Sequence, residues 1–173
     1  MNTVITARLK LISLTHEHLL LTQKERAKLE KYLGLNPSAM IIDPLFKTEM
    51  DAALLNFWLP NTYAYPDLYH WYTNWQIVVK STNTIIGSIG FGGYPDDYGE
   101  TTIGYMVDQQ HQSQGYATEA LQALSRWGFS FSMLKAIAAD TKTDNPASKQ
   151  VLLKAGFRQT HTVKNALYFK LKK

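Results

Sequence analysis

The stretch HQSQGYATEAL, residues 111–121, has the residue types of a loop that could hold a phosphate group. The first N–H groups of a helix have no partner inside the helix and carry a partial positive charge, so they attract anions. Gly115 would allow a ligand to approach the backbone, and the small Ala117 would leave the first turn open. The predicted contact residues are Gln112, Ser113, Gln114, Gly115, Tyr116, Ala117 and Thr118. An ordinary turn between a strand and a helix has a similar composition, so this stretch alone leaves both interpretations open.

The segments on either side predict a strand that enters this loop and a helix that leaves it. The run ETTIGYMV, residues 100–107, is rich in β-branched and aromatic residues, as expected of a strand. From Tyr116 to Phe131, apolar residues recur at spacings of three and four, which is typical of an amphipathic helix. The loop therefore lies where the start of a helix would face a ligand.

A second strand and helix are predicted further along the chain. The short apolar run over Lys135–Thr141 predicts a buried strand, and residues 146–155 predict a helix. Pro146 suits the first turn of that helix, and Gly156 suits the position just after its end.

The remaining segments complete a mixture of strands and helices. Further strands are expected over residues 6–14, 76–80, 84–94, 157–164 and 166–171, and further helices over 16–33 and 45–59. Thr15 is the expected N-cap of the first helix, Gly34 is expected after its end, and Pro60 is expected to stop the second. This order of elements predicts a single mixed α/β or α+β domain over residues 1–173.

Composition excludes several classes of function. The chain has a net charge of +4, which suits an anionic ligand but does not indicate nucleic acid. It has no cysteine, which excludes disulfides and thiol catalysis, and its five histidines show no metal-binding spacing, so no metal is expected. We expect neither a signal peptide nor a membrane-spanning helix, and therefore a cytoplasmic protein.

Two motifs in this order resemble the GNAT superfamily of acyl-CoA-dependent N-acyltransferases. The first is the Gln112-to-Ala117 loop between strand and helix, and the second is the run DNPASKQVLLKAGF, residues 144–157. Within the superfamily, the sequence resembles the branch of ribosomal-protein N-terminal acetyltransferases. The resemblance implies one domain with a twisted, mostly antiparallel sheet of about seven strands flanked by helices. It also implies that the sheet splays between the strand ending near Asp108 and the strand at Lys135–Thr141.

The resemblance also assigns the binding residues for acetyl-CoA. The loop would bind the pyrophosphate of coenzyme A, while Asn145 and Ser148 would contact the pantetheine arm. Pantetheine would pair with the backbone of Met106, Val107 and Asp108, and an N–H group near Val107 or Asp108 would stabilise the oxyanion. No metal is implied. The implied reaction is direct transfer of an acetyl group to a primary amine.

The proton-transfer residues are less directly specified. Many members of the family carry a tyrosine acid seven positions after the asparagine, where this chain has Leu152. Ser148 is the candidate replacement, with a role in cofactor contact as the alternative. Glu100 is the candidate base, with an exposed turn carboxylate as the alternative. Tyr105 could face the acyl site or pack in the core.

The acceptor is not specified beyond an amine on a small molecule or a peptide. The aromatic segment from Tyr63 to Trp75 is predicted either to pack in the core or to line a substrate pocket, with Tyr65 and Trp71 as candidate substrate contacts. We expect a monomer or a homodimer with no nucleic-acid or membrane partner. The alternative function is a catalytically silent acyl-CoA-binding or regulatory protein of the same fold.

Overall fold

Eight strands form one open sheet in the order β1-β2-β3-β4-β5-β6-β8-β7. A computed structural model describes residues 2–173 of the chain. The strands are β1 (Thr3–Ile5), β2 (Leu9–Ser13), β3 (Trp75–Val79), β4 (Thr84–Phe91), β5 (Glu100–Val107), β6 (Ala136–Lys142), β7 (Arg158–Val163) and β8 (Ala166–Lys172). Every neighbouring pair is antiparallel except β5 and β6, which are parallel. The prediction of a mostly antiparallel sheet is confirmed, with eight strands in place of about seven.

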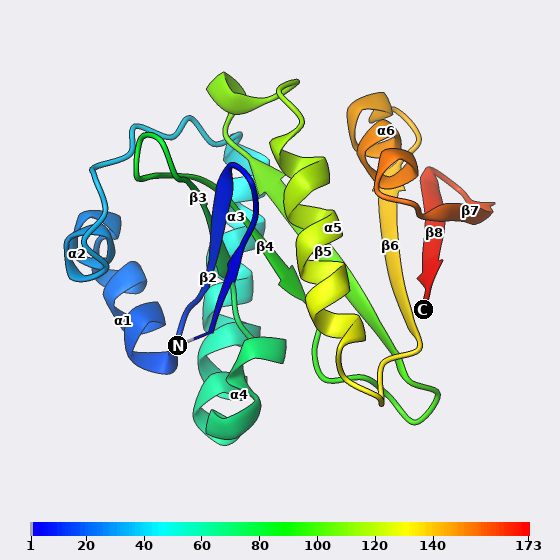
Figure 1. The fold of residues 1–173 in the computed structure, drawn as a ribbon, viewed down its shortest axis with the longest axis horizontal. Coiled ribbons are helices and arrows are strands. Elements are labelled where there is room, and N and C mark those ends of the chain that lie inside the picture. Colours follow the sequence, from blue (N-terminus) through cyan, green and yellow to red (C-terminus); the bar gives the residue numbers. More distant parts are fainter. Residues whose placement is uncertain (1) are drawn as a thin grey trace.

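Helices cover both faces of the sheet. The α-helices within residues 2–173 are α1 (His16–Lys24), α2 (Arg26–Tyr32), α3 (Pro44–Ala53), α4 (Leu59–Ala64), α5 (Tyr116–Phe129) and α6 (Pro146–Lys154). Three short turns accompany them: the π-helix η1 (Leu54–Trp58) and the 3₁₀-helices η2 (Pro66–Trp71) and η3 (Gln109–His111). Figure 1 shows α5 in front of the sheet and α3 behind it, so the sheet is the middle layer.

The sheet opens between β5 and β6. These strands pair only at their beginnings, where Glu100–Thr102 face Ala136–Ala138. Figure 1 shows the two strands diverging from there toward α6 and toward the loop before α5. Residues 103–107 of β5 therefore present an edge that does not pair with β6, about 17 Å long at 3.3 Å per residue. The predicted splay is confirmed.

The N-terminal half differs from the sequence prediction in three places. Strand β1 was not predicted, because its three residues carry no periodic pattern. The first helix is capped by Thr15 as predicted, but it breaks at Glu25, whose extended backbone (φ −172°, ψ 125°) separates α1 from α2. The helical path does not stop before Pro60, which lies in the first turn of α4, where its missing N–H is tolerated.

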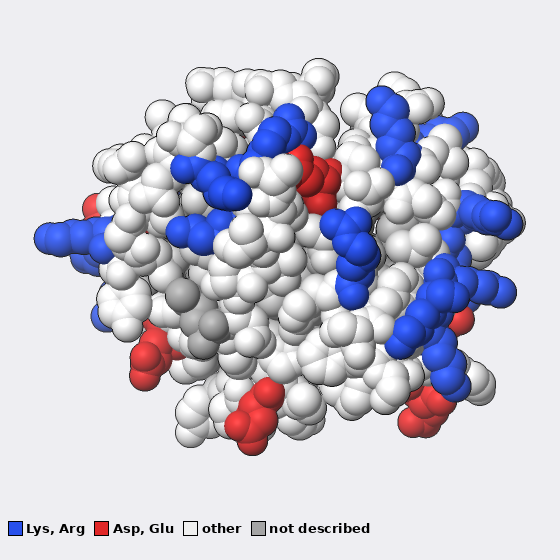
Figure 2. All heavy atoms as spheres, in the orientation of Figure 1, with Lys and Arg blue, Asp and Glu red and all other residues white. Residues whose placement is uncertain are grey.

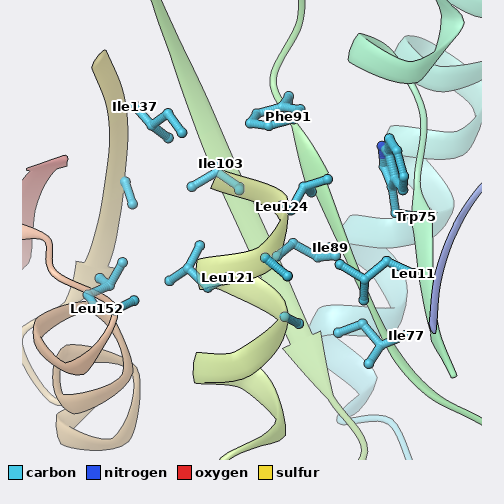
Figure 3. Close-up of a cluster of buried hydrophobic side chains, with 14 of the residues drawn as sticks. Leu11, Trp75, Ile77, Ile89, Phe91, Ile103, Leu121, Leu124, Ile137 and Leu152 are labelled. Atoms are coloured by element: carbon cyan, nitrogen blue, oxygen red, sulfur yellow. The ribbon is translucent and has the colours of Figure 1, made fainter. Parts of the chain in front are cut away.

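The main core lies between the sheet and the helices α5 and α6. Figure 3 shows its central side chains, which include Leu11, Ile77, Ile89 and Ile103 from the strands and Leu121 and Leu124 from α5. Along the strands these residues alternate with residues of the opposite face, where Ile12, Val78 and Ile85 form a second cluster with Leu35. Among residues 2–173, no helix is both long enough and apolar enough to cross a membrane.

Candidate active site

Two residues with left-handed backbone shape the loop before α5. Gly115 has φ 80° and directly precedes the first residue of α5, and Ser113 has φ 61°. Glycine adopts this region without a steric penalty, which explains its position at the turn into the helix. A Cβ atom at position 115 would meet only Nη2 of Arg8, at 3.4 Å, so the backbone here is otherwise open.

The first turn of α5 has unused hydrogen-bond donors. Glu119 is the first helical residue whose N–H bonds backward, to the Gly115 carbonyl oxygen at 3.0 Å. The N–H groups of Tyr116, Ala117 and Thr118 have no acceptor within the part of the chain that the structure describes. Three free N–H groups beside an open glycine suit an anionic group.

Arg8, in the turn between β1 and β2, holds this loop from the side. Its Nη1 donates to the Gln114 carbonyl oxygen at 3.0 Å, and its Nε donates to Glu119 Oε2 at 2.7 Å. The guanidinium also lies 4.5 Å from the centre of the Tyr116 ring. Sequence reasoning missed Arg8, because more than 100 residues separate it from the loop and no local pattern connects the two.

Glu119 lies in the first turn of α5, but its carboxylate points away from the open donors, so its negative charge does not face an anion bound there. Its Oε1 accepts hydrogen bonds from Thr6 Oγ1 at 2.6 Å and from the Arg8 N–H at 3.0 Å. Partial burial raises the pKa of Glu119, but the bonds from Thr6 and Arg8 and the charge of Arg8 outweigh it, so the pKa lies below its usual value.

The free edge of β5 offers the backbone of Val107 but not that of its neighbours. The Asp108 N–H donates to the Ile86 carbonyl oxygen at 2.8 Å, on the β4 side. The direction of backbone hydrogen bonding alternates along a strand. The backbone of Met106 therefore also faces β4, and that of Val107 faces the gap, the opening between β5 and β6. This corrects the expectation that Met106 and Asp108 pair with pantetheine through their backbone. Gln112 Nε2 donates to the Val107 carbonyl oxygen at 3.0 Å, which joins the loop to this edge.

The Asp108 side chain is a structural anchor. It is buried and accepts hydrogen bonds from the Ile41 N–H at 2.9 Å and from His111 Nδ1 at 2.7 Å. Burial raises the pKa of Asp108, but these bonds and a weaker one from the Gln110 N–H lower it below its usual value overall. Asp108 thereby ties the end of β5 to the segment before α3.

Two of the predicted residues, Tyr105 of β5 and Ser148 of α6, contact each other across the gap. Asn145 caps α6 by accepting the Ser148 N–H at 3.0 Å. The Tyr105 hydroxyl lies 3.0 Å from Ser148 Oγ and 3.2 Å from the Ser148 carbonyl oxygen. Burial raises the pKa of Tyr105, partly offset by the bond with Ser148, so its hydroxyl keeps its proton at neutral pH.

Leu152 cannot take part in proton transfer. It is fully buried in the main core, and Figure 3 shows it facing Leu121 of α5. The structure therefore places an apolar contact where many family members carry the tyrosine acid.

Glu100 lies apart from the Tyr105–Ser148 pair. It begins β5, in the part that still pairs with β6. Both of its oxygens accept from Lys170 Nζ, at 2.7 and 2.8 Å. It shares a face of β5 with Gly104 by alternation, but it must leave the ion pair before it can accept a proton.

The two aromatic candidates have different surroundings. Trp71 has no exposed surface and packs on Phe91 and Trp127, with ring centres 4.8 and 5.5 Å apart. It cannot contact a substrate, so that prediction is wrong and the packing alternative holds. Tyr65 is 48% exposed and stacks on Tyr72 at 5.2 Å, which leaves one ring face available.

The family is decided by a match over most of the chain. The family model described as an acetyltransferase (GNAT) domain matches residues 8–158, a range that includes the free edge of β5, the loop and α6. The chain belongs to the GNAT acetyltransferase family. The predicted family is confirmed.

Curated GNAT relatives match over part of their length. The chain is 37% identical over 90 residues to the uncharacterized N-acetyltransferase YjdG of Bacillus subtilis, which covers 52% of this chain and 54% of the relative. It is 35% identical over 82 residues to the ribosomal-protein-serine acetyltransferase of Escherichia coli, which covers 47% of this chain and 46% of the relative. The chain thus spans about half the length of the curated relatives that it matches.

Solved structures match over nearly the whole chain. The structure of the ribosomal L7/L12 alpha-N-protein acetyltransferase RimL in complex with coenzyme A aligns with a TM-score of 0.69 and 16% identity. The alignment covers 99% of this chain and 98% of that chain. At this identity the likeness shows the fold alone.

Proposed function

We propose that this GNAT domain transfers the acetyl group of acetyl-CoA to a primary amine by direct attack in a ternary complex. The observation that carries the proposal is the juxtaposition of the free edge of β5 with the open first turn of α5. The edge suits an extended amide-containing chain, and the three free N–H groups suit a pyrophosphate. Gln112 connects the two through its bond to Val107.

The charge distribution supports the same assignment. Residues 135–173 contain nine Lys and Arg residues but only two Asp and Glu residues, although the whole chain has a net charge of only +4. Figure 2 shows positive side chains gathered over α6, β7 and β8, on the β6 side of the opening between β5 and β6. A positive field here would attract the phosphate groups of coenzyme A.

The reaction requires a neutral amine. An alkyl amine with a pKa of about 10.4 is neutral in only about one molecule in 2,500 at pH 7, a cost of about 4.6 kcal/mol. The amine nitrogen forms a bond to the acetyl carbon, the carbon–sulfur bond breaks, and the amine proton passes to a base. Glu100 remains our candidate base, acting after separation from Lys170.

The leaving thiolate must gain a proton. Ser148 Oγ is our candidate donor, because Asn145 fixes its position at the start of α6 on the gap. Tyr105, hydrogen-bonded to Ser148, supports this role, since its protonated hydroxyl can return a proton to the serine. The backbone N–H of Val107 on the free edge is the candidate oxyanion donor.

Thiol release from acetyl-CoA with a panel of primary amines tests the proposal. We expect turnover with at least one amine, and a fall in kcat of about 10²-fold or more for Ser148→Ala and for Glu100→Gln. Ser81→Ala, in the exposed turn between β3 and β4, is the matched control and should retain full activity. Unchanged kcat in either test variant would remove that residue from the mechanism.

A catalytically silent acyl-CoA-binding protein predicts a different result. Acetyl-CoA would raise Tm, but no amine in the panel would release thiol. The comparisons favour the enzyme, because the named relatives are N-acetyltransferases.

A further inference from the structure

A cavity of about 510 Å³ lies on the face of the sheet opposite α5, between α1, α3 and the π-helix η1. Its apolar wall includes Leu14, Leu19, Leu54 and Trp58. Its polar groups include Gln23, Arg26 and Asn74. The size and the mixture of an apolar wall with a few polar groups are typical of small-molecule sites, and π-turns occur frequently at functional sites.

Arg26 is the exceptional member of this lining. Within residues 2–173 its guanidinium has no hydrogen-bond or ion-pair partner, although burial is the main influence on it and lowers its pKa. The two acids whose charges act on it, Glu30 and Asp108, are buried and bonded elsewhere. Glu30 accepts from Ser38, and Asp108 accepts from Ile41 and His111.

An unpaired guanidinium in a partly buried cavity favours an anionic ligand. Its five N–H donors match the two oxygens of a carboxylate, and a charge that is partly removed from water is stabilised by a partner of opposite charge. The side-chain amides of Gln23 and Asn74 likewise bond to no residue that the structure describes, although Asn74 is only 4% exposed. The cavity therefore offers one unpaired cationic group and two free amides above an apolar wall. The other charged groups of its lining, Lys47 and Asp51, are exposed and pair with each other.

The cavity also lies close to the open edge of β5. Asn74 lies against Gly90, since a Cβ at position 90 would be 3.8 Å from the Asn74 Cα. Gly90 pairs directly with Gly104 of β5, where a Cβ would meet nothing within 4 Å. At about 4.8 Å between strands, about 10 Å separates Asn74 from the free edge. A ligand seated at Arg26 could thus extend an amine over Gly104 toward that edge.

We propose that this cavity binds the acceptor, and that the acceptor is an amine that also carries a carboxylate and an apolar body, such as an amino acid or a short amino carboxylate. The proposal rests on the proposed N-acetyltransferase function. Arg26 pairs with the carboxylate, the wall around Leu54 and Trp58 covers the apolar body, and the amine reaches the gap.

Matched acceptors test the carboxylate requirement. Leucine is compared with leucinamide, and 6-aminohexanoic acid with hexylamine, by thiol release at saturating acetyl-CoA. We expect the amino acid to have at least about a tenfold higher kcat/KM than the matched amine without a carboxylate wherever a pair is turned over, since a polar site rejects ligands that leave it unpaired. A preference for leucinamide or hexylamine overturns the proposal.

Two substitutions test whether the preference for acceptors with a carboxylate arises in the cavity. Arg26→Gln should abolish the discrimination while the Kd for coenzyme A stays unchanged, and the exposed control Arg126→Gln should retain it. Asn74→Asp, which keeps the shape of the side chain, places a negative charge in the cavity and should disfavour both acids even if Arg26→Gln folds poorly. Undiminished discrimination in a folded Arg26→Gln or Asn74→Asp protein overturns the proposal.

Calorimetry separates this proposal from the proposed function. If acetyl-CoA binds but no amine in any panel is acetylated, the enzymatic function fails. Titration of leucine and 6-aminohexanoic acid into the protein with coenzyme A then tests the cavity alone. Binding weakened about tenfold by Arg26→Gln supports the carboxylate site, and binding that is absent or indifferent to this change overturns it. Turnover of other amines without any preference for acids overturns only the present proposal.

Discussion

Residues 112–117 form the loop that we propose binds coenzyme A. The strongest test of this loop is a replacement of Glu119, whose carboxylate holds Arg8 against it. Glu119 in the first turn of α5 accepts from Thr6 Oγ1 at 2.6 Å, from the Arg8 N–H at 3.0 Å and from Arg8 Nε at 2.7 Å. Replacement by glutamine keeps the shape and leaves one oxygen to accept from Thr6 and the Arg8 N–H. The change removes the charge and sets an NH₂ group against the Arg8 guanidinium.

The expected loss is the ion pair with Arg8. A hydrogen bond to a charged group contributes about 1.5–3 kcal/mol. The Arg8 side chain is 46% exposed and that of Glu119 is 19% exposed, so solvent screening reduces the value to about 1–2 kcal/mol. In a domain of this size each kcal/mol shifts Tm by about 2–4 °C, so Glu119→Gln should lower Tm by about 2–8 °C at pH 7.

The loss should depend on pH in a defined direction. The pKa of Glu119 is lower in the folded protein than in the unfolded chain, so the unfolded state binds more protons. The contribution of Glu119 is therefore fully present above its unfolded pKa of about 4.3 and disappears as pH falls through the lower folded pKa. The difference in Tm between wild type and Glu119→Gln should be constant at neutral pH and vanish in acid.

Thermal unfolding of a double-mutant cycle provides the assay. Arg8→Met, Glu119→Gln and the double variant should show a coupling of about 1–2 kcal/mol, and calorimetry should show weaker coenzyme A binding in each, because Arg8 also holds the Gln114 carbonyl. Asp51→Asn breaks the exposed pair with Lys47 on α3 and is the control, with an expected effect below about 0.5 kcal/mol. Purely additive effects of Arg8→Met and Glu119→Gln would refute the reasoning.

Four further variants test the site. Gly115→Glu adds a side chain and a negative charge beside the open N–H groups, so calorimetry should show at least a tenfold rise in the Kd for coenzyme A in a folded protein; normal affinity would rule out the loop. Tyr105→Phe should slow turnover less than Ser148→Ala in steady-state assays, because it removes the supporting hydroxyl only; an equal or larger effect would make Tyr105 the donor. Trp71→Ala should lower the free energy of unfolding by about 3–5 kcal/mol in urea titrations, and a stable variant with a raised KM would restore the pocket interpretation. Tyr65→Ala should raise KM for the amine without changing that for acetyl-CoA, and an unchanged KM would exclude Tyr65 from the acceptor site.

The strand and helices around the loop at residues 112–117 could be predicted, because the residues that determine them lie within each element or at its ends. Gly115 and Pro146 mark helix starts, and Gly156 marks a helix end; all three occupy the positions that their backbone chemistry favours. The strand over residues 100–107 has the predicted bounds, because its residue types agree with its place in the sheet. Local preference and tertiary structure point the same way here, which is the condition under which sequence patterns succeed.

The contacts that complete the site could not be predicted in this way. Arg8 and Glu119 are 111 residues apart, and their pairing depends on how the β1–β2 turn folds over α5. The backbone direction of Met106 and Asp108 depends on the register of β5 against β4, and a shift of one residue would reverse it. The burial of Trp71 depends on aromatic neighbours that are distant in sequence, including Phe91 of β4 and Trp127 of α5. Each of these features belongs to the tertiary arrangement and has no counterpart in a short stretch of sequence.

This chain has Leu152 where many family members carry a tyrosine acid, and two other hydroxyl groups face the gap instead. The next turn of α6 carries no acid at this position, because Leu152 packs there in the core. The hydroxyls near the gap come instead from Ser148 at the start of α6 and from Tyr105 on β5, and they lie within hydrogen-bond distance of each other. Because these hydroxyls belong to elements that diverge at the splay, the distance between them responds to how far β5 and α6 separate. With Ser148 as the donor that we propose, proton delivery to a thiolate would be coupled to the geometry of this opening, whereas a single tyrosine on α6 would depend on the position of that helix alone.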